Sequence, residues 1–231
     1  MRSIVVGMGI GALYLDVLNK LGHDVITVDT TKMAHYYRLD WALADYGKFD
    51  CAFICTPNHT HEELAYLLAD HAKIVFVEKP GVVTAERWQT MVAAKPFTRF
   101  MMVKNNQYRE EMQFFKLLKD RSRTIDIKWI NKNRVPSPGT WFTDKQFAFG
   151  GVSRDLMPHL LSICCELDPT ICQQSTNSQF EKQQRWTLTD VSDTDYGTVK
   201  ADGVYNVDDY CHVELNCNNV KFDLTADWRS M

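Results

Sequence analysis

The first twelve residues constrain the fold more than any other part of the chain. The β-branched run Ile4-Val5-Val6 leads directly into Gly7-Met8-Gly9-Ile10-Gly11-Ala12, and an amphipathic helical pattern follows. The spacing is G-x-G-x-x-A at a strand-to-helix junction, a variant of the turn that binds a dinucleotide pyrophosphate. In such a turn Gly7 permits the tight bend, Gly9 lets the backbone approach the phosphates, and Ala12 allows close packing of the helix on the strand. The sequence therefore predicts a cofactor-binding loop over residues 7–12, with the anion at the helix N-terminus.

Apolar strand-like runs and longer helical patterns alternate through the first half of the chain. The predicted strands are Ser3–Val6, Asp24–Asp29, Cys51–Cys55, Ile74–Val77 and Arg99–Val103, and the predicted helices are Ile10–Leu21, His61–Asp70, Ala85–Ala94 and Glu110–Lys119. This alternation is typical of a doubly wound parallel sheet of the Rossmann type, an α/β fold. Only 21 residues separate Asp29 from Cys51, too few for a helix, a strand and two loops, so one element is expected to be shortened.

The pattern changes near residue 121, where we place a boundary between domains 1–121 and 122–231. A strand at Thr124–Lys132 and a Pro/Gly loop lead into a helix at Asp155–Leu167. Three later runs alternate in strand fashion, namely Arg185–Val191, Tyr210–Leu215 and Val220–Thr225, with turns at Asp202-Gly203 and Asn218-Asn219. We therefore expect a small α+β domain with an antiparallel sheet, and a mobile Gln/Ser-rich stretch at Gln173–Gln184.

Composition excludes several classes of partner. The net charge is −3 and the basic residues are not clustered, so no nucleic-acid partner is predicted. No apolar run is long enough to span a membrane, and the N-terminus lacks the pattern of a signal peptide. The seven cysteines contain no C-x-x-C pair, which favours a reduced, cytoplasmic protein. His59 and His61 with Glu62 and Glu63 lack a clear further ligand, so no metal site is predicted.

Asp29 bears on the choice of cofactor. It ends the second predicted strand, 20 positions after Gly9, where an acidic side chain accepts hydrogen bonds from the adenosine ribose. A carboxylate repels a 2′-phosphate, so NAD is favoured over NADP, although the nearby Lys32 softens that repulsion.

Three further motifs occur in a fixed order along the chain. Phe53-Ile-Cys-Thr-Pro-Asn58 is followed by His61, then by Val75-Phe-Val-Glu-Lys-Pro80, and then by Gly150-Gly-Val-Ser-Arg-Asp-Leu-Met-Pro-His159. Together they resemble the "TPN…H", "EKP" and "GGG…D-x-G-x-H" motifs of the Gfo/Idh/MocA family. Trp141 matches as well, and Val103–Arg109 is similar to that family's "N-x-R" strand. The resemblance implies an NAD(P)-dependent oxidoreductase with a shortened C-terminal domain. It implies these further cofactor-binding residues: Thr56, Pro57, Asn58, His61, Glu78, Lys79, Pro80 and Trp141.

The sequence departs from the family pattern at three points. Ala12 replaces the last glycine of the fingerprint, Val152 replaces a glycine of the "GGG" run, and Met157 replaces the glycine of "D-x-G-x-H". Met157 is expected to place a bulky side chain near the substrate. Only about 65 residues follow the motif helix, fewer than the resemblance leads us to expect.

Lys79, Asp155 and His159 form the predicted catalytic set. Oxidising an alcohol needs a base for the hydroxyl proton, and a histidine such as His159 titrates near neutrality. Asp155 lies four residues earlier, on the same face of a helix, and is expected to orient the imidazole or hold substrate. Pro158 requires that the helix start nearby or kink there. Lys79 is expected to stabilise the substrate oxygen.

The resemblance implies a sugar or polyol-like substrate carrying a hydroxyl or carbonyl carbon. Two alternatives stay open, a C=C or C=N reductase like biliverdin reductase and a non-catalytic dinucleotide-binding protein.

Apolar residues alternate with polar ones in the late strands, namely Trp186, Leu188, Val213, Leu215, Phe222 and Leu224. One face of that sheet is expected to pack on the helix containing Cys164 and Cys165, and the resemblance implies that the other face forms a homodimer.

Overall fold

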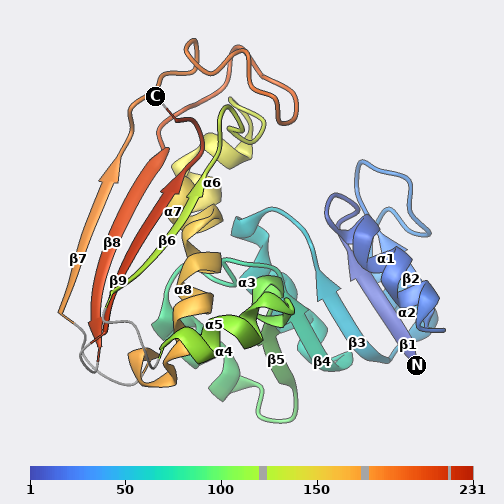
Figure 1. Cartoon of the computed structure of the whole chain (residues 1–231). Coiled ribbons are helices and arrows are strands. Elements are labelled where there is room, and N and C mark those ends of the chain that lie inside the picture. Colours follow the sequence, from blue (N-terminus) through green and yellow to red (C-terminus); the bar gives the residue numbers. More distant parts are fainter. Residues whose placement is uncertain (120–123, 173–176, 218–219, 231) are drawn as a thin grey trace. The chain divides into compact units, whose positions relative to one another are not determined.

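The chain divides into two compact units, Met1–Val103 and Lys104–Met231 (Figure 1). The computed structural model describes residues 1–119, 124–172, 177–217 and 220–230. The division comes earlier than the boundary placed after residue 121, because helix α5 (Glu111–Lys119) packs on helix α8 (Met157–Leu167) of the second unit.

The first unit contains a five-stranded, fully parallel sheet in the order β2-β1-β3-β4-β5. Its strands are β1 (Arg2–Val6), β2 (Asp24–Val28), β3 (Phe49–Ile54), β4 (Ala72–Val77) and β5 (Arg99–Met102). Its helices are α1 (Gly11–Lys20), α2 (Leu39–Tyr46), the 3₁₀ turn η1 (Asn58–Thr60), α3 (His61–Ala69) and α4 (Ala85–Ala94). The central strands are buried on both faces, which explains their continuous apolar sequences. The predicted Rossmann-type sheet is confirmed.

The segment between β2 and β3 contains the shortened element that chain length required. Beyond β2 the chain forms a single β-bridge, between Val28 and Tyr36, in place of a full strand, and then enters α2.

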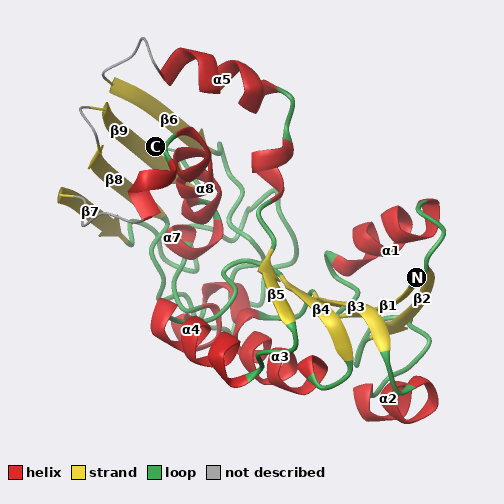
Figure 2. Ribbon diagram, turned by 90° about the horizontal axis from the view of Figure 1, so that it is seen from below, coloured by secondary structure: helices red, strands yellow, loops and turns green. Residues whose placement is uncertain are grey.

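Helices cover the two faces of this sheet unequally (Figure 2). Helix α1 lies on one face, and α2, α3 and α4 lie on the other. The larger core packs under α2–α4, and the smaller one under α1 contains Val5, Phe53 and Cys55. Because the strands are parallel, the loops that follow β1, β2, β3 and β4 all leave from one edge, where ligands bind in folds of this class.

The second unit contains a four-stranded mixed sheet in the order β6-β9-β8-β7. Its strands are β6 (Thr124–Ile130), β7 (Asn177–Gln183), β8 (Tyr210–Cys217) and β9 (Val220–Asp227). Besides α5 and α8, its helices are η2 (Asn105–Tyr108), η3 (Trp141–Thr143), α6 (Lys145–Ala148), α7 (Val152–Asp155) and η4 (Pro169–Cys172). Strands β8 and β9 are antiparallel as predicted, and β7 also joins β8 antiparallel, but β6 joins β9 in parallel. The sheet is therefore mixed rather than purely antiparallel.

Two predictions of secondary structure in the second unit are wrong. Within the stretch expected to be mobile, residues 177–183 form β7; residues 173–176 lie outside the described residues. The run Arg185–Val191, predicted as a strand, forms no strand in the structure. The backbone N–H groups of Arg185 and Trp186 donate to the Asp209 carboxylate, and Thr187 forms a turn with Asp190. The runs predicted at Tyr210–Leu215 and Val220–Thr225 are confirmed as β8 and β9, and the turn at 218–219 lies outside the described residues.

Helix α8 covers one face of the mixed sheet. Cys164 and Leu160 of α8 share a core cluster with Val213, Phe222 and Leu224 of the sheet, as predicted. Within the described part of the chain, no helix combines the length and hydropathy needed to cross a membrane.

Candidate functional site

The glycine-rich loop that follows β1 contains glycines with two structural roles. Gly7 has φ +93°, and a Cβ there would lie 2.6 Å from the carbonyl oxygen of Cys55. A Cβ on Gly11, the first residue of α1, would lie 2.9 Å from Val5 Cγ1. Ala12 is exposed, so the close helix–strand contact is made by Gly11 and not by Ala12 as predicted. The reason is that Gly11, one residue earlier, is the position on α1 that faces the strand.

Gly9 has no such structural role. Its φ lies outside the left-handed region, and the nearest atom that a Cβ would meet is Lys32 Nζ, at 3.8 Å. Neither conformation nor packing within the protein requires a glycine at this position. In the described structure no side chain caps the N-terminus of α1, which begins two residues later. The loop is therefore open above Gly9, where a ligand would approach the backbone.

Asp29 fixes the glycine-rich loop against the end of β2. Its Oδ2 accepts a hydrogen bond from Met8 N at 2.6 Å, and its Oδ1 accepts from Thr31 N and Lys32 N, both at 2.7 Å. Burial by itself would raise the pKa of Asp29, but these backbone donors lower it below its usual value. Asp29 is therefore a carboxylate at neutral pH, placed beside the loop as predicted.

The "TPN" and "EKP" segments leave β3 and β4 side by side at the same edge of the sheet. Cys55 N donates to Val6 O at 2.8 Å, and Glu78 N donates to Ile54 O at 3.0 Å, so pairing continues one residue past each strand. Thr56, Pro57 and Asn58 follow β3, and Glu78, Lys79 and Pro80 follow β4, with a cis peptide bond between Lys79 and Pro80. The structure thus brings the predicted cofactor residues of the first unit to one edge.

His61 has a different role from the one predicted. Its side chain is 1% exposed, with Nε2 2.8 Å from the Thr56 carbonyl oxygen and Nδ1 3.1 Å from the Gly81 carbonyl oxygen. Burial lowers the pKa of His61 below its usual value despite these two carbonyl groups. His61 links the two loops from inside the protein, and so little exposed surface leaves no room for a direct cofactor contact.

The other predicted site residues, Trp141, Asp155 and His159, lie in the second unit. Asp155 ends α7 and His159 lies in the first turn of α8, with Leu156 between the two helices. The helix therefore starts at the residue before Pro158, one of the two geometries expected. Asp155 Oδ2 accepts a hydrogen bond from Trp228 Nε1 at 2.9 Å, and the ring of His159 lies 5.4 Å from that of Trp129.

Trp141 and Met157 occupy different environments. Trp141 begins η3 and stacks on Phe142, with 3.8 Å between ring centroids. Met157 is 1% exposed and packs in the hydrophobic core. Met157 therefore does not project toward a substrate, as the sequence suggested, because α8 turns this position into the core.

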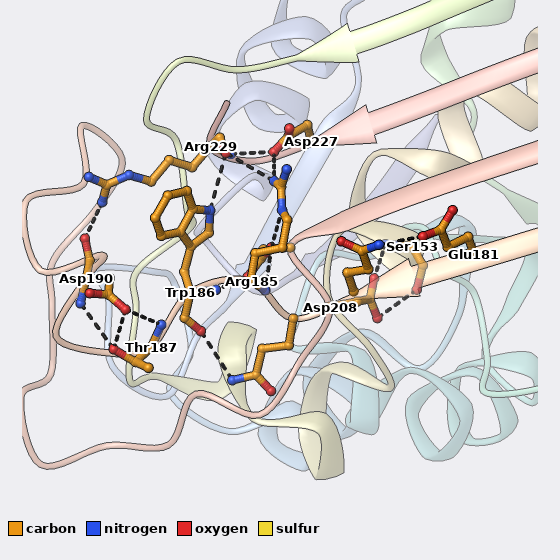
Figure 3. Close-up of polar contacts among 12 residues, drawn as sticks. Ser153, Glu181, Arg185, Trp186, Thr187, Asp190, Asp208, Asp227 and Arg229 are labelled. Atoms are coloured by element: carbon orange, nitrogen blue, oxygen red, sulfur yellow. Dashed lines mark hydrogen bonds and ion pairs between the residues drawn. The ribbon is translucent and has the colours of Figure 1, made fainter. Parts of the chain in front are cut away.

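Asp208 holds the Gly-Gly motif in place, and sequence reasoning did not identify it. Its carboxylate accepts hydrogen bonds from Ser153 N at 2.7 Å and from Ser153 Oγ at 3.0 Å (Figure 3). Its carbonyl oxygen accepts from Val152 N at 2.8 Å, and a Cβ on Gly151 would overlap that same oxygen. Because Gly151 has no side chain, the Asp208 backbone can approach it closely. This contact fixes the start of α7 at Val152, three residues before Asp155.

A buried charge cluster lies at the end of the same sheet (Figure 3). Arg185, with a side chain 14% exposed, pairs with Asp209 through Nε at 3.1 Å and with Asp227 through Nη2. The two carboxylate side chains are 0% and 6% exposed. Burial raises the pKa of Asp209 even though the donors from Arg185 and Trp186 lower it. The cluster holds the loop that contains Trp186 against β9.

The face of the mixed sheet opposite α8 is polar. His212 Nε2 lies 2.9 Å from Asp223 Oδ1, and Lys221 Nζ lies 2.7 Å from Glu214 Oε1. Ligand atoms of His212, Glu214 and Asp223 all lie within 4.8 Å of one another, and Lys221 Nζ pairs with Glu214 at 2.7 Å and lies 3.9 Å from Asp223.

A comparison with known protein families gives a match in the first unit. Residues 16–98 match the family model described as the Gfo/Idh/MocA oxidoreductase family with an NAD-binding Rossmann fold. This match lies wholly within the first unit and runs from within α1 to the turn before β5, so it covers β2, β3 and β4. The first unit is therefore similar to the Gfo/Idh/MocA oxidoreductase family over residues 16–98.

Individual proteins similar to this chain include an oxidoreductase subunit and a dehydrogenase. A putative UDP-kanosamine synthase oxidoreductase subunit from Amycolatopsis mediterranei is 30% identical over 116 residues, which cover 48% of this chain and 32% of that protein. GenD2 from gentamicin A biosynthesis, solved with NAD, has a TM-score of 0.77 at 21% identity and covers 100% of this chain and 66% of its own. Levoglucosan dehydrogenase, solved with NADH and levoglucosan, has a TM-score of 0.76 at 16% identity, over 100% and 67%.

The structural likeness extends over both units, as a third example shows. The WlbA dehydrogenase from Bordetella pertussis, solved with NADH and UDP-GlcNAcA, has a TM-score of 0.74 at 15% identity, over 99% of this chain and 71% of its own. The chain therefore spans about two thirds of the length of these solved proteins and a third of the curated relative. At these identities the structural likeness establishes the fold of both units.

Proposed function

We propose that this protein is an NAD(P)-dependent oxidoreductase that transfers a hydride between nicotinamide and a hydroxyl or carbonyl carbon of a sugar or polyol-like substrate. The open space at Gly9 carries the cofactor part of the proposal, since nothing within the described protein requires a glycine there. The uncapped N-terminus of α1 and the Asp29 carboxylate lie beside it, matching a pyrophosphate and an adenosine ribose. The named ligands of the similar proteins, levoglucosan and UDP-GlcNAcA, support the substrate class.

The predicted cofactor residues of the first unit, apart from the buried His61, have roles toward different parts of the cofactor. Backbone N–H groups of residues 9–12 would bind the pyrophosphate, and Asp29 would accept hydrogen bonds from ribose hydroxyls. Thr56–Asn58 and Glu78–Pro80 would line the nicotinamide half. Bound nicotinamide supplies the hydride acceptor or donor.

The acid–base chemistry falls to the predicted catalytic set. His159 would take the hydroxyl proton during oxidation and return it during reduction, because an imidazole ring can both accept and donate a proton. Lys79 would stabilise negative charge developing on the substrate oxygen. Asp155, held at Oδ2 by Trp228, would orient the imidazole or bind substrate.

Gly9→Ala tests the cofactor site directly. The added methyl meets only Lys32 Nζ at 3.8 Å, so thermal stability should change little, whereas NADH affinity measured by calorimetry should fall at least about tenfold. Unchanged NADH affinity in a folded variant would remove the main support for the site.

Asp29 should make the protein prefer NAD(H) to NADP(H). Asp29→Ala should narrow that preference and weaken both cofactors, because it also releases Met8 of the loop. Calorimetry with each cofactor measures the ratio, and tighter NADPH binding by the unmutated protein would contradict the assignment.

Catalysis requires a substrate, so a panel of sugars, polyols and sugar acids is first screened with NAD. His159→Ala should then cut turnover by about 10²–10⁴-fold while sparing NADH binding, and Lys79→Ala should also cut turnover. Asp155→Asn should cost less than His159→Ala if it only orients the imidazole, and more if it also binds substrate. Activity that survives both alanine variants would favour the non-catalytic or alternative reductase functions.

We also propose a cytoplasmic homodimer. Cys51, Cys55, Cys164, Cys211 and Cys217 form no disulfide in the described structure, which suits a reducing compartment. The polar face of the mixed sheet includes Ile130, which is 49% exposed. Ile130→Asp should lower the mass measured by light scattering from dimer to monomer, and Phe97→Asp, at the 99% exposed Phe97 of the first unit, should not. A monomeric unmutated protein at micromolar concentration would overturn the dimer.

A further inference from the structure

Tyr14 of α1 contacts the "EKP" loop. This loop follows β4, which lies two strands away from β1, the strand that precedes α1. The ring of Tyr14 lies 5.6 Å from that of Phe53 on β3, and Phe53 stacks on Phe76 of β4 at 4.7 Å. This aromatic row crosses the sheet on the face that α1 covers. At its end the Tyr14 hydroxyl donates a hydrogen bond to Glu78 Oε1.

The proton of this pair belongs to Tyr14. Burial first, and then the neighbouring Glu78 carboxylate, raise the pKa of Tyr14 far above its usual value. The phenol therefore stays an O–H donor and the carboxylate remains the acceptor.

Glu78 is held at both of its oxygens. Oε1 accepts from Tyr14, and Oε2 accepts from the backbone N–H of Lys79 at 3.1 Å. A carboxylate has about four acceptor positions, and these two donors use one on each oxygen. The half-buried Glu78 thus has a fixed orientation while keeping acceptor capacity at the edge where the cofactor loops meet.

The position of Glu78 along that edge determines which part of a dinucleotide it meets. Asp29 follows β2, on one side of β1, and Glu78 follows β4, on the other side of β1. A dinucleotide with its adenosine ribose at Asp29 and its pyrophosphate at Gly9 extends its second ribose toward β3 and β4.

We propose that Tyr14 is a positioning residue for the second ribose: it orients the Glu78 carboxylate to accept hydrogen bonds from the hydroxyls of the nicotinamide ribose. This inference rests on the proposed function, since it requires a dinucleotide at this edge. The hydroxyl of Tyr14 acts only through Glu78, and its ring packing serves the fold separately.

Three ligands separate this role from a structural one. ADP lacks the second ribose, ADP-ribose contains it, and NADH adds the nicotinamide. Tyr14→Phe keeps the ring contact with Phe53 and removes the donor. Calorimetry should show ADP affinity unchanged, and ADP-ribose and NADH affinities both reduced about tenfold, the scale of one charge-assisted hydrogen bond.

Tyr205→Phe is the matched control. The Tyr205 hydroxyl also donates to a carboxylate, that of Asp209 at 3.2 Å, but in the second unit. This variant should lose stability without changing the affinity for any of the three ligands. Glu78→Gln should also weaken ADP-ribose selectively, and Tyr14→Phe should add little in the Glu78→Gln background, because both changes remove the same interaction.

The outcomes distinguish this inference from the proposed function. If the unmutated protein binds neither ADP nor NADH, the cofactor site fails and the role of Tyr14 fails with it. If it binds all three ligands but Tyr14→Phe changes none of them, or weakens ADP equally, only the role of Tyr14 is overturned. If Tyr14→Phe does not fold, Glu78→Gln provides the test. ADP-ribose affinity unchanged by Glu78→Gln would then overturn the role of Tyr14.

Discussion

The two units of this protein place their charges differently. In the first unit the ion pairs lie at the surface, as in Lys73 and Asp50, whose side chains are 78% and 29% exposed. In the second unit Arg185 is enclosed with Asp209 and Asp227. Exposed pairs contribute little to stability, whereas a buried cluster becomes costly when one partner is lost. The parallel sheet is therefore held by apolar packing, and the mixed sheet depends in addition on a polar network that joins distant segments.

Removing Arg185 gives the sharpest test of this difference. Arg185→Met leaves two buried carboxylates without their cation, and we expect a loss of about 3–5 kcal/mol in the free energy of unfolding. Lys73→Met, the matched change at the surface of the first unit, should cost less than about 1 kcal/mol. Denaturant unfolding measures both, and hydrogen exchange should show the Arg185 variant opening β8 and β9 before β1 and β3. Equal losses in the two variants would remove the contrast.

Two glycine substitutions, one in each unit, test whether the units also differ in how tightly the backbone packs. Gly151→Ala places a methyl group on the Asp208 carbonyl oxygen, and we expect it to cost about 3 kcal/mol and to loosen the start of α7. The same substitution at Gly9 meets only Lys32 Nζ at 3.8 Å and should cost less than about 0.5 kcal/mol. Differential scanning calorimetry gives both values. A Gly151 variant as stable as the Gly9 variant would show that the Asp208 contact is not a constraint.

Asp29 gives the smallest effect and the one that depends on pH. Because its pKa is lowered in the folded state, its stabilising effect is fully present above the ordinary carboxyl pKa and is lost as pH falls through the lowered value. Asp29→Asn should cost about 1 kcal/mol at pH 7, since the partly exposed carboxylate loses charge-assisted bonds to backbone N–H groups. The difference from the unmutated protein should shrink on acidification.

Amide exchange offers a local check on Asp29. Its variant should exchange faster at Met8, Thr31 and Lys32, whose N–H groups the carboxylate accepts. A stability difference that grew at low pH would contradict the direction of this pKa shift.

The predictability of the site also differs between the units. The motif residues of the first unit could be placed from sequence because parallel pairing sends the ends of adjacent strands to one edge. The role of Gly11 in place of Ala12, and the burial of His61, depended on which side of a helix faces the sheet. Tyr14 left no signal, because a tyrosine in an amphipathic helix is typical of ordinary core packing.

In the second unit the same reasoning was wrong where polar side chains replace regular pairing. Arg185–Val191 alternates as a strand does, yet its first N–H groups bond to Asp209, which lies 24 residues from Arg185 in the sequence. No local pattern encodes a partner so distant. The Gln-rich residues 177–183 form β7 because β8 supplies an edge to pair with.

The sequence by itself determined the parallel sheet, the glycine-rich loop, the shortened element after β2 and the apolar face under α8, because these follow from local periodicity and chain length. Only the tertiary structure decided the parallel pairing of β6 with β9, the buried Arg185 cluster, the contact of Asp208 with Gly151 and the hydrogen bond from Tyr14 to Glu78. Each of these joins residues far apart in the chain. Their energy depends on burial and distance, and neither exists until the chain has folded.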